Sequence, residues 1–456
     1  LTFKSAKLCA FGSTRRKGAA AKDDENLQKL LEANTTTAVI FGKAWDLHAR
    51  DILGVSPEEN LAMIADTVAF LRDRGREVIF DAEHFFDGCR ANPEYALKVL
   101  QTAQNAGAAV LCLCDTNGGT MPVEIFNVTK TVCEKFNKST IGIHAHDDGG
   151  CAAANTLVAV SAGASHIQGT FTGFGERCGN ASLSAVIPAL KLKYELECDG
   201  ALPLLKQTAA AVALVANTQI PHSQPYIGKS AFSHKAGMHI DGVIKNSASF
   251  EHIPPEAVGN SRRFLVSEVA GRGSVLEKIR PFAPQLTKTS PELGKIIETL
   301  KEREHYGYQY ESADAGFELL VKKVLGMYTP HFELVFYKTT GEFPSPDGEA
   351  TASATIKVNV SGQTEVTAAL GHGSVNALDL ALRKALTVFY PQLAGMSLTD
   401  YKVRVLEQKA ATAAKVRVLI ESAAGGESWT TIGVSEDIIE ASLLALADSI
   451  EYFLQL

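Results

Sequence analysis

The feature that most constrains the fold is an alternation in the first 200 residues, where a short apolar run is followed six times by a segment of helical periodicity. Runs of this length that are apolar throughout are typical of parallel strands covered on both faces. The six runs are AKLCAFG, AVIFG, EVIFDAE, AVLCLCD, IGIHAH and HIQGT. The pattern therefore predicts an α/β fold with six parallel strands joined by helices.

The segments between the runs carry helix start signals. In Ser56-Pro57-Glu58-Glu59 the serine can cap a helix and the proline fits its first turn, and Asn92-Pro93 repeats the arrangement. Six such units fit either an open doubly wound sheet or a (β/α)8 TIM barrel whose first two βα units are missing. No run is followed by Gly-x-Gly-x-x-Gly, which disfavours the dinucleotide-binding open sheet. We therefore expect a truncated barrel over residues 1–200.

The strand rhythm disappears after this region. Residues 201–315 contain helical segments and a glycine-punctuated stretch, SHKAGMHIDG, which we interpret as a linker and lid. Over residues 316–456 the order strand, strand, strand, helix occurs twice, at an interval of about 60 residues. Such a duplicated βββα module, without an obvious nucleophile or metal cluster, suits binding or regulation.

Composition disfavours several classes of protein. A net charge of −7 without a sustained Lys/Arg run argues against a nucleic-acid partner. No apolar stretch approaches the roughly 20 residues that span a bilayer, and the first residues lack a signal-peptide pattern. The eight cysteines form no Cys-x-x-Cys pair and are expected to be reduced and mostly buried. We therefore expect a cytoplasmic enzyme of small molecules, or an organellar one if a targeting segment preceded Leu1, which is not a methionine.

Polar residues gather where each apolar run ends. In a parallel barrel these ends open on one face, where barrel enzymes place their chemistry, so one site can collect them. The polar groups are Ser13-Thr14-Arg15-Arg16, Lys43, Glu83-His84, Asp115-Thr116-Asn117, His144-Ala145-His146 and Gly169-Thr170.

His144 and His146 are candidate ligands of a divalent cation. They lie two apart on an expected strand, so both imidazoles project from the same side and can meet one ion. Asp147 and Asp148 follow directly and could orient the rings or tune the charge of the site. The alternative is that the two histidines are satisfied core or surface residues.

Glu83 is a candidate general acid or base. It ends the run EVIFDAE among aromatic residues, and burial of this kind can raise the pKa of a carboxyl group. The alternative is that Glu83 forms an ion pair with Arg15, Arg16 or Lys43 at the same rim.

Three further residues are weaker candidates. Thr116 could hold a substrate carboxylate or cap the following helix. Asn180 lies in the loop GFGERCGNAS, which could bring its amide oxygen to the open face or serve as a helix entry turn. His239, with Asp241 two residues on, lies outside the barrel and would act only if the lid folds over the site.

Together these segments resemble the family of α-isopropylmalate, homocitrate and citramalate synthases, which are metal-dependent barrels that carry out Claisen condensations. The likeness covers nearly the whole chain and is greatest to the citramalate synthases, and GIHAH followed by GERCGN is specific to the family. The segments that carry it are AFGSTRRKG, FGKAWDLH, DAEHFFDG, LCDTNGGT, GIHAHDDGG, QGTFTGFGERCGN, SHKAGMHIDGVIKN and VGNSRRFL.

The resemblance implies the roles of the candidate residues. His144, His146 and Asn180 would face a divalent metal, which would be Mn²⁺, Mg²⁺ or Zn²⁺. Glu83 and His239 would be catalytic, with Asp241 orienting His239. Thr116 would hold the carboxylate of the 2-oxo acid.

The resemblance also implies activity and partners. Acetyl-CoA and pyruvate would condense to citramalate and CoA in isoleucine biosynthesis. A LeuA-type allosteric dimerisation domain over residues 316–456 would sense isoleucine or leucine, and a homodimer would supply His239 from the partner's lid.

Three departures from the family pattern stand out. The family's first strand carries an Arg-Asp pair that this chain does not contain, the usual lid tyrosine is Phe250, and a usual Gly-Asn-Gly reads Gly371-His372-Gly373. The alternatives are therefore a 2-isopropylmalate synthase acting on 2-oxoisovalerate, a related acyl-CoA lyase, and a non-catalytic regulatory or binding protein.

Overall fold

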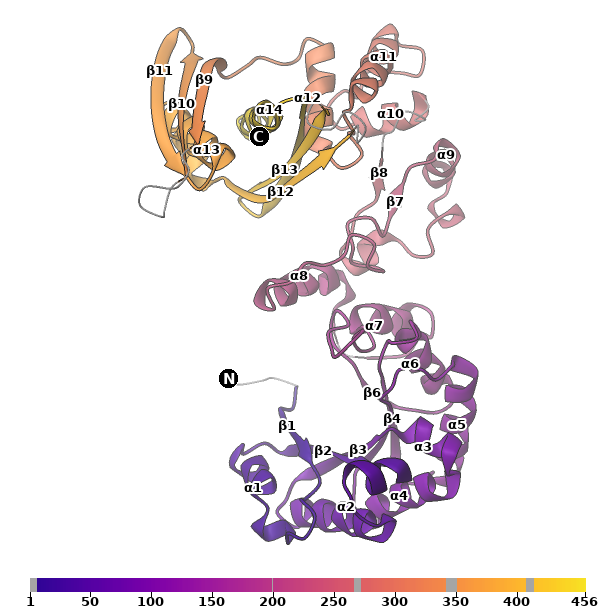
Figure 1. The fold of residues 1–456 in the computed structure, drawn as a ribbon. Helices are drawn as coiled ribbons and strands as arrows, with labels where there is room; N and C mark the ends of the chain where they lie inside the picture. Colours follow the sequence, from indigo (N-terminus) through magenta and orange to yellow (C-terminus); the bar gives the residue numbers. More distant parts are fainter. Residues whose placement is uncertain (1–5, 199, 266–271, 342–350, 407–413) are drawn as a thin grey trace. The chain divides into compact units, whose positions relative to one another are not determined.

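The structure is a computed structural model that describes residues 6–198, 200–265, 272–341, 351–406 and 414–456. The chain forms two compact units (Figure 1). The first contains Leu1–Phe232 and Ile253–Ser261, and the second contains Ser233–His252 and Arg262–Leu456. Among the described helices, none combines the length and apolar character needed to cross a membrane.

A six-stranded parallel sheet forms the centre of the first unit. Each strand pairs with the next strand of the sequence, in the order β1 to β6. A doubly wound sheet would reverse this order at a switch point, whereas unbroken sequential order is that of a barrel wall. The barrel prediction is therefore confirmed, and the open-sheet alternative is wrong. The strands are β1 (Cys9–Ser13), β2 (Thr37–Lys43), β3 (Glu77–Glu83), β4 (Val110–Asp115), β5 (Thr140–Ala145) and β6 (His166–Gln168).

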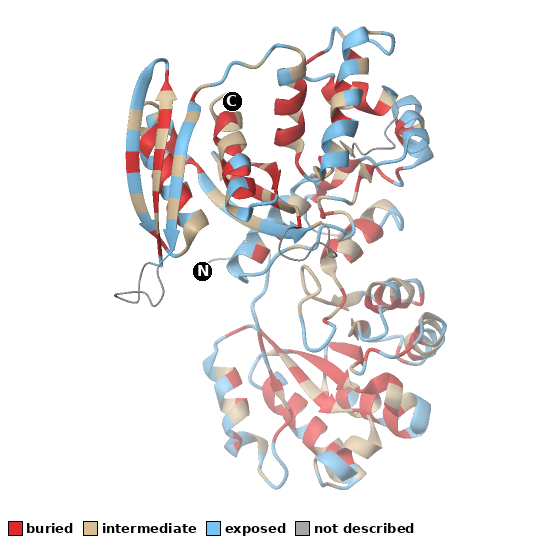
Figure 2. Cartoon of the chain, turned by 45° about the horizontal axis from the view of Figure 1, so that its top comes forward, coloured by how far each residue is buried: buried red, intermediate tan, exposed pale blue. Residues whose placement is uncertain are grey.

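Helices cover one face of this sheet and bury its apolar side chains. Ile40, Phe80 and Leu111 are fully buried in the core between the strands and the helices. Buried residues lie along both the strands and the helices of this unit (Figure 2). The predicted starts of two helices are confirmed, since Ser56 caps α2 and Asn92 caps α4 through their side-chain oxygens. The helices are α1 (Glu25–Glu32), α2 (Pro57–Arg72), α3 (Phe85–Ala91), α4 (Pro93–Ala106), α5 (Pro122–Lys135), α6 (Ala152–Ser161), α7 (Leu183–Leu192) and α8 (Leu205–Val215), with a π-helical turn η2 (His48–Ile52).

The second unit begins with short elements and then a helical segment. β7 and β8 pair in parallel, and α10, α11 and α12 enclose a small apolar core around Val275, Ile296 and Phe317. The elements are β7 (Ser233–His234), α9 (Gly237–Lys245), β8 (Arg263–Phe264), α10 (Arg272–Ile279), α11 (Pro291–Tyr306) and α12 (Asp314–Val324). The three-part division at residues 200 and 315 stays a prediction.

The end of the chain contains the predicted duplication. Two antiparallel three-stranded sheets, β11-β10-β9 and β12-β13-β14, each precede a long helix, and both repeats bury side chains in one core that includes Ile356, Leu382, Ile420 and Leu446. The βββα repeat is therefore confirmed. Its elements are β9 (Glu333–Gly341), β10 (Ala352–Val360), β11 (Gln363–Gly371), α13 (Ser374–Thr387), β12 (Ser397–Val405), β13 (Val416–Ala424), β14 (Glu427–Ser435) and α14 (Ile438–Phe453).

Gly433 lies where β14 passes very close to α14. A Cβ atom at Gly433 would lie 2.0 Å from the backbone oxygen of Ala441 in α14. Backbone cannot yield as the end of a side chain can, so only glycine fits this position of β14.

We predict that Gly433→Ala lowers the free energy of unfolding by about 1–3 kcal/mol, because the added methyl group forces α14 away from the sheet. Gly294→Ala is the matched control, since Gly294 lies within α11 with no atom near its added Cβ, and alanine there should stabilise the helix by up to about 1 kcal/mol. Denaturant unfolding measures both variants. Equal stability of the two would contradict the packing described here.

Candidate active site

Five neighbouring strands, β2 to β6, place polar side chains on the face of the sheet that is turned away from the helices. Along β3, β4 and β5, residues that belong to the apolar core under the helices alternate with residues that point to the opposite face. In register, Lys43 lies beside Glu83, Cys114 beside His144, and His144 beside Gln168. The pairing of successive strands therefore aligns these side chains in one row across the sheet.

His144 and His146 point their Nε2 atoms at each other. The two nitrogens are 3.3 Å apart, with the rings tilted by 46°. Two nitrogens at this separation, each about 2.1 Å from one cation, subtend roughly 100° at the ion, which suits neighbouring ligands. Burial lowers the pKa of His146, aided by the charges of His144 and Arg177, so the imidazole stays neutral as ligation requires.

Asn180 lies beside His146 through an isolated antiparallel bridge, which puts both side chains on the same side. Its Nδ2 donates to the backbone oxygen of Phe174 at 3.2 Å, while its Oδ1 is buried and has no hydrogen-bond donor among the described residues. A Cβ at Gly175 would lie 2.7 Å from that Nδ2, so the glycine makes room for the amide.

A buried acceptor without a donor needs a partner, and a cation is one. The two imidazoles and the amide oxygen therefore fit a divalent metal ion. The structure brings all three predicted ligands into one place, and their binding of a metal stays a prediction.

Gln168 was missed by sequence reasoning. Its Oε1 lies 2.9 Å from Nδ1 of His144, and its Nε2 donates to Oδ1 of Asp81 at 2.7 Å. Burial raises the pKa of Asp81 to about 6, against the opposing effects of Gln168, His144 and Cys112. The period-two spacing with His166 could have placed Gln168 on the inner face, but only the strand register puts it next to His144.

The expectation that Asp147 and Asp148 orient the two histidine rings is wrong. Oδ1 of Asp147 accepts from the backbone N–H of Ala152 at the start of α6, and Asp148 forms an ion pair with Arg177. Both carboxylates follow the end of β5, where the chain turns toward other loops and away from the ring nitrogens.

Glu83 forms an ion pair with Lys43, the neighbour with which it is in register. Arg15, another partner considered for it, is buried and instead pairs with Glu59 and Asp66. The ion-pair interpretation of Glu83 therefore matches the observed contact, and its catalytic role stays a prediction.

Thr116 does not cap the following helix, because α5 begins at Pro122. Its Oγ1 accepts from the backbone N–H of His84 at 2.9 Å, which ties the ends of β3 and β4 together. The hydroxyl hydrogen is then free to point elsewhere, as holding a carboxylate would require.

Arg177 joins three loops at the carboxyl ends of the strands. Its Nε and Nη2 donate to the two carboxylate oxygens of Asp148 at 2.7 and 2.9 Å, and Nη2 also donates to the backbone oxygen of Thr116 at 2.8 Å. The glycine-rich loop that carries Asn180 is thereby held to the loops after β4 and β5. This residue, too, was missed from the sequence.

His239 and Asp241 belong to the second unit, on α9. Two residues apart on a helix, they face different directions. His239 stacks on Phe250 at 4.2 Å between ring centroids, and Asp241 pairs with Lys245. The expectation that Asp241 orients His239 is therefore wrong for this structure, and the catalytic roles of both stay predictions.

Three family models match successive parts of the chain. An HMGL-like model matches residues 6–212, a homocitrate synthase post-HMGL domain-like model matches residues 226–306, and a LeuA allosteric (dimerisation) domain model matches residues 311–454. The order agrees with the barrel, the intervening segment and the duplicated module.

Curated proteins match over nearly the full chain. The (R)-citramalate synthase of Aquifex aeolicus is 48% identical over 99% of this chain and 86% of its own length, and that of Synechocystis is 48% identical over 99% and 85%. A probable 2-isopropylmalate synthase of Methanopyrus kandleri is 31% identical over 92% and 81%.

We predict that Arg177→Ala loosens the glycine-rich loop, so that amides of residues 173–179 exchange roughly three- to tenfold faster, because the loop loses its only described ion pair to Asp148. Arg90→Ala is the control, since Arg90 makes a similar two-pronged pair with Glu124 elsewhere on the barrel. Hydrogen exchange followed by mass spectrometry measures both. Unchanged amide exchange in Arg177→Ala would contradict the proposal that Arg177 holds the glycine-rich loop to its neighbours.

Proposed function

The chain belongs to the citramalate synthases of the HMGL-like family, and we propose that it condenses acetyl-CoA with pyruvate and hydrolyses the thioester, giving citramalate and CoA for isoleucine biosynthesis. The observation that carries this proposal is the convergence of His144, His146 and Asn180 at the carboxyl ends of the strands of such a barrel. Pyruvate is favoured over 2-oxoisovalerate because the relatives that are 44–48% identical to this chain all have the name (R)-citramalate synthase.

The donor set supports a divalent metal at this site. Mixed imidazole and amide-oxygen ligands suit Mn²⁺, with Mg²⁺ and Zn²⁺ as the other candidates. A cation held there would polarise the keto group of the 2-oxo acid and stabilise the developing alkoxide.

Protein groups supply the proton transfers. Glu83, which pairs with Lys43, would take a proton from the methyl group of acetyl-CoA, and His239 of the lid is the second candidate base. The enolate then attacks the keto carbon, and water cleaves the thioester to release CoA. Thr116, with its hydroxyl hydrogen free, would donate to the carboxylate of pyruvate.

A cavity of about 350 Å³ at the ends of β1 and β2 supports the binding of CoA. Arg16 and Lys17 line it and are exposed, as phosphate recognition requires, whereas Arg15 is occupied by its carboxylate partners. Ile52 and Leu53 give the same cavity an apolar wall that suits the pantetheine arm.

The protein is predicted to release CoA from acetyl-CoA when pyruvate and Mn²⁺ are present. Asn180→Ala should weaken Mn²⁺ binding by at least about tenfold, because the cation loses an oxygen ligand. Asn127→Ala, at an exposed position of α5, is the control. Thiol release measures turnover and calorimetry measures Mn²⁺. If only 2-oxoisovalerate supported turnover, the protein would be a 2-isopropylmalate synthase and this proposal would be wrong.

The duplicated module supports allosteric control in a homodimer. Phe336 and Val366 flank Lys357 in register and, with Leu370, expose apolar side chains on the sheet face turned away from α13. A partner subunit would cover such a face. The lid carrying His239 would then serve the partner's site.

A cavity of about 540 Å³ in the same module supports an amino-acid effector. Asp379 and Arg383, which pair with each other, line it together with the apolar Val375, Met396 and Leu398. A branched-chain amino acid, either isoleucine or leucine, combines the charged groups and the apolar side chain that such a lining recognises.

We predict that calorimetry detects the binding of isoleucine or leucine, and that Asp379→Ala weakens it roughly tenfold or more, because the effector's ammonium group loses its carboxylate. Asp448→Ala is the control, since Asp448 is an acidic residue of α14 that does not line the cavity. Effector binding without any binding of Mn²⁺ would favour the non-catalytic regulator over the enzyme.

A further inference from the structure

We propose that Asp81, acting through Gln168, fixes the tautomer and the orientation of His144 so that its Nε2 lone pair faces the bound cation. The inference rests on the proposed function, because it assumes that His144 is a metal ligand. It assigns Asp81 and Gln168 as positioning residues that act on the metal site without touching the substrate.

The three side chains form an unbroken series of contacts from β3 across to β5. Oδ1 of Asp81 lies 2.7 Å from Nε2 of Gln168, and Oε1 of Gln168 lies 2.9 Å from Nδ1 of His144. Asp81 is only 5% exposed, so water does not replace these contacts. The other ring nitrogen of His144, Nε2, faces His146.

The chemistry of each group then determines the proton positions. An ionised carboxylate only accepts hydrogen bonds, so Gln168 must turn its NH₂ group toward Asp81 and its oxygen toward His144. That oxygen also only accepts, so Nδ1 of His144 must carry the proton. Nε2 is left with its lone pair, which is the form that binds a metal.

His166 supports the same orientation of the Gln168 side-chain amide. Its Nε2 lies 3.5 Å from Nε2 of Gln168, within reach of the second amide hydrogen. Burial lowers the pKa of His166, so its ring is neutral and offers a lone pair. All polar atoms of the Gln168 amide therefore have complementary neighbours.

Gly142 opens the space through which Gln168 reaches Asp81. It lies in register between Cys112 and His166, and a Cβ there would lie 3.2 Å from Sγ of Cys112 and 2.9 Å from Cδ2 of His166. A side chain at this position would fill the gap between β4 and β6 on the inner face. The glycine therefore allows a contact between side chains that start on strands three apart.

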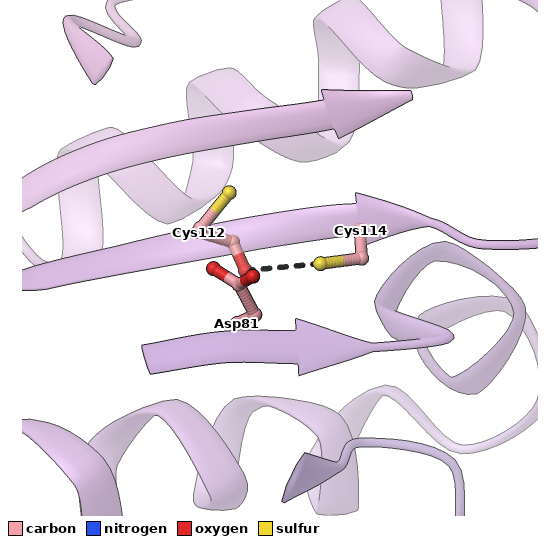
Figure 3. A group of neighbouring side chains, drawn as sticks. All are labelled: Asp81, Cys112 and Cys114. Atoms are coloured by element: carbon pink, nitrogen blue, oxygen red, sulfur yellow. Dashed lines mark hydrogen bonds between the residues drawn. The ribbon is translucent and has the colours of Figure 1, made fainter. Parts of the chain in front are cut away.

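Asp81 is also part of a compact group with Cys112 and Cys114, whose ligand atoms lie within 4.8 Å of one another (Figure 3). This group could be mistaken for the metal site. Burial raises the pKa of the Cys112 thiol well above its usual value, and the Cys114 thiol donates to the backbone oxygen of Cys112 at 3.8 Å. Asp81 is instead occupied by Gln168, which fits a supporting role.

The test uses the full-length protein, free of metal and substrate, with ¹⁵N-labelled histidine, and assigns the His144 signals by their loss in His144→Gln. The parent should show His144 protonated at Nδ1. Gln168→Leu and Asp81→Val should shift it toward the Nε2-protonated form and weaken Mn²⁺ binding roughly 10–100-fold. Asp81→Asn keeps an oxygen acceptor of the same size, so it should restore both readings to near those of the parent.

Thr156→Val is the matched control, because Thr156 is buried in the same unit and donates to the backbone oxygen of Ala152, with no described contact to Gln168 or His144. It should leave the tautomer and the Mn²⁺ affinity unchanged. Parent-like His144 spectra and Mn²⁺ affinity in folded Gln168→Leu would overturn the inference, and the same result in Asp81→Val would remove Asp81 from it. Since neither reading depends on turnover, a parent that binds Mn²⁺ but shows no turnover would refute the proposed function and leave this inference standing.

Discussion

The in-register pairing of each strand with its successor is the constraint on which the site depends. Parallel pairing in sequential order puts the carboxyl ends of β3, β4, β5 and β6 side by side, so residues separated by tens of positions become neighbours. Gln168 meets His144, 24 residues away, and Asp81, 87 residues away. A shift of one residue in β6 would turn Gln168 to the opposite face and dissolve this arrangement.

The inner face of the sheet carries polar groups at a depth where unsatisfied ones are costly. Asp81, Gln168, His166 and His144 satisfy one another, whereas Oδ1 of Asn180 and Nδ1 of His146 are left without partners among the described residues. Polar groups that stabilise the fold therefore have partners within the protein, whereas a buried acceptor without one is a candidate ligand for a cation. Of these two atoms only Oδ1 of Asn180 belongs to the proposed metal site, since His146 would bind the cation through Nε2.

Local signals in the sequence were sufficient for the elements. Apolar runs bounded by turns predicted all six barrel strands, capping residues predicted the starts of α2 and α4, and a repeated pattern predicted the duplicated βββα module. These signals depend on residues close together in the chain. The His144 and His146 pair was visible for the same reason, because two residues of one strand share a face whatever the strand pairs with.

Contacts between distant residues were not visible in this way. The sequence by itself determined the strands, the helices, the repeat and the candidate ligands, since periodicity and capping are properties of neighbouring residues. Only the tertiary structure decided that Gln168, and not Asp147 or Asp148, holds His144, and that Glu83 pairs with Lys43. The physical reason is that register and loop direction depend on the packing of the whole barrel, which no short stretch of the chain encodes.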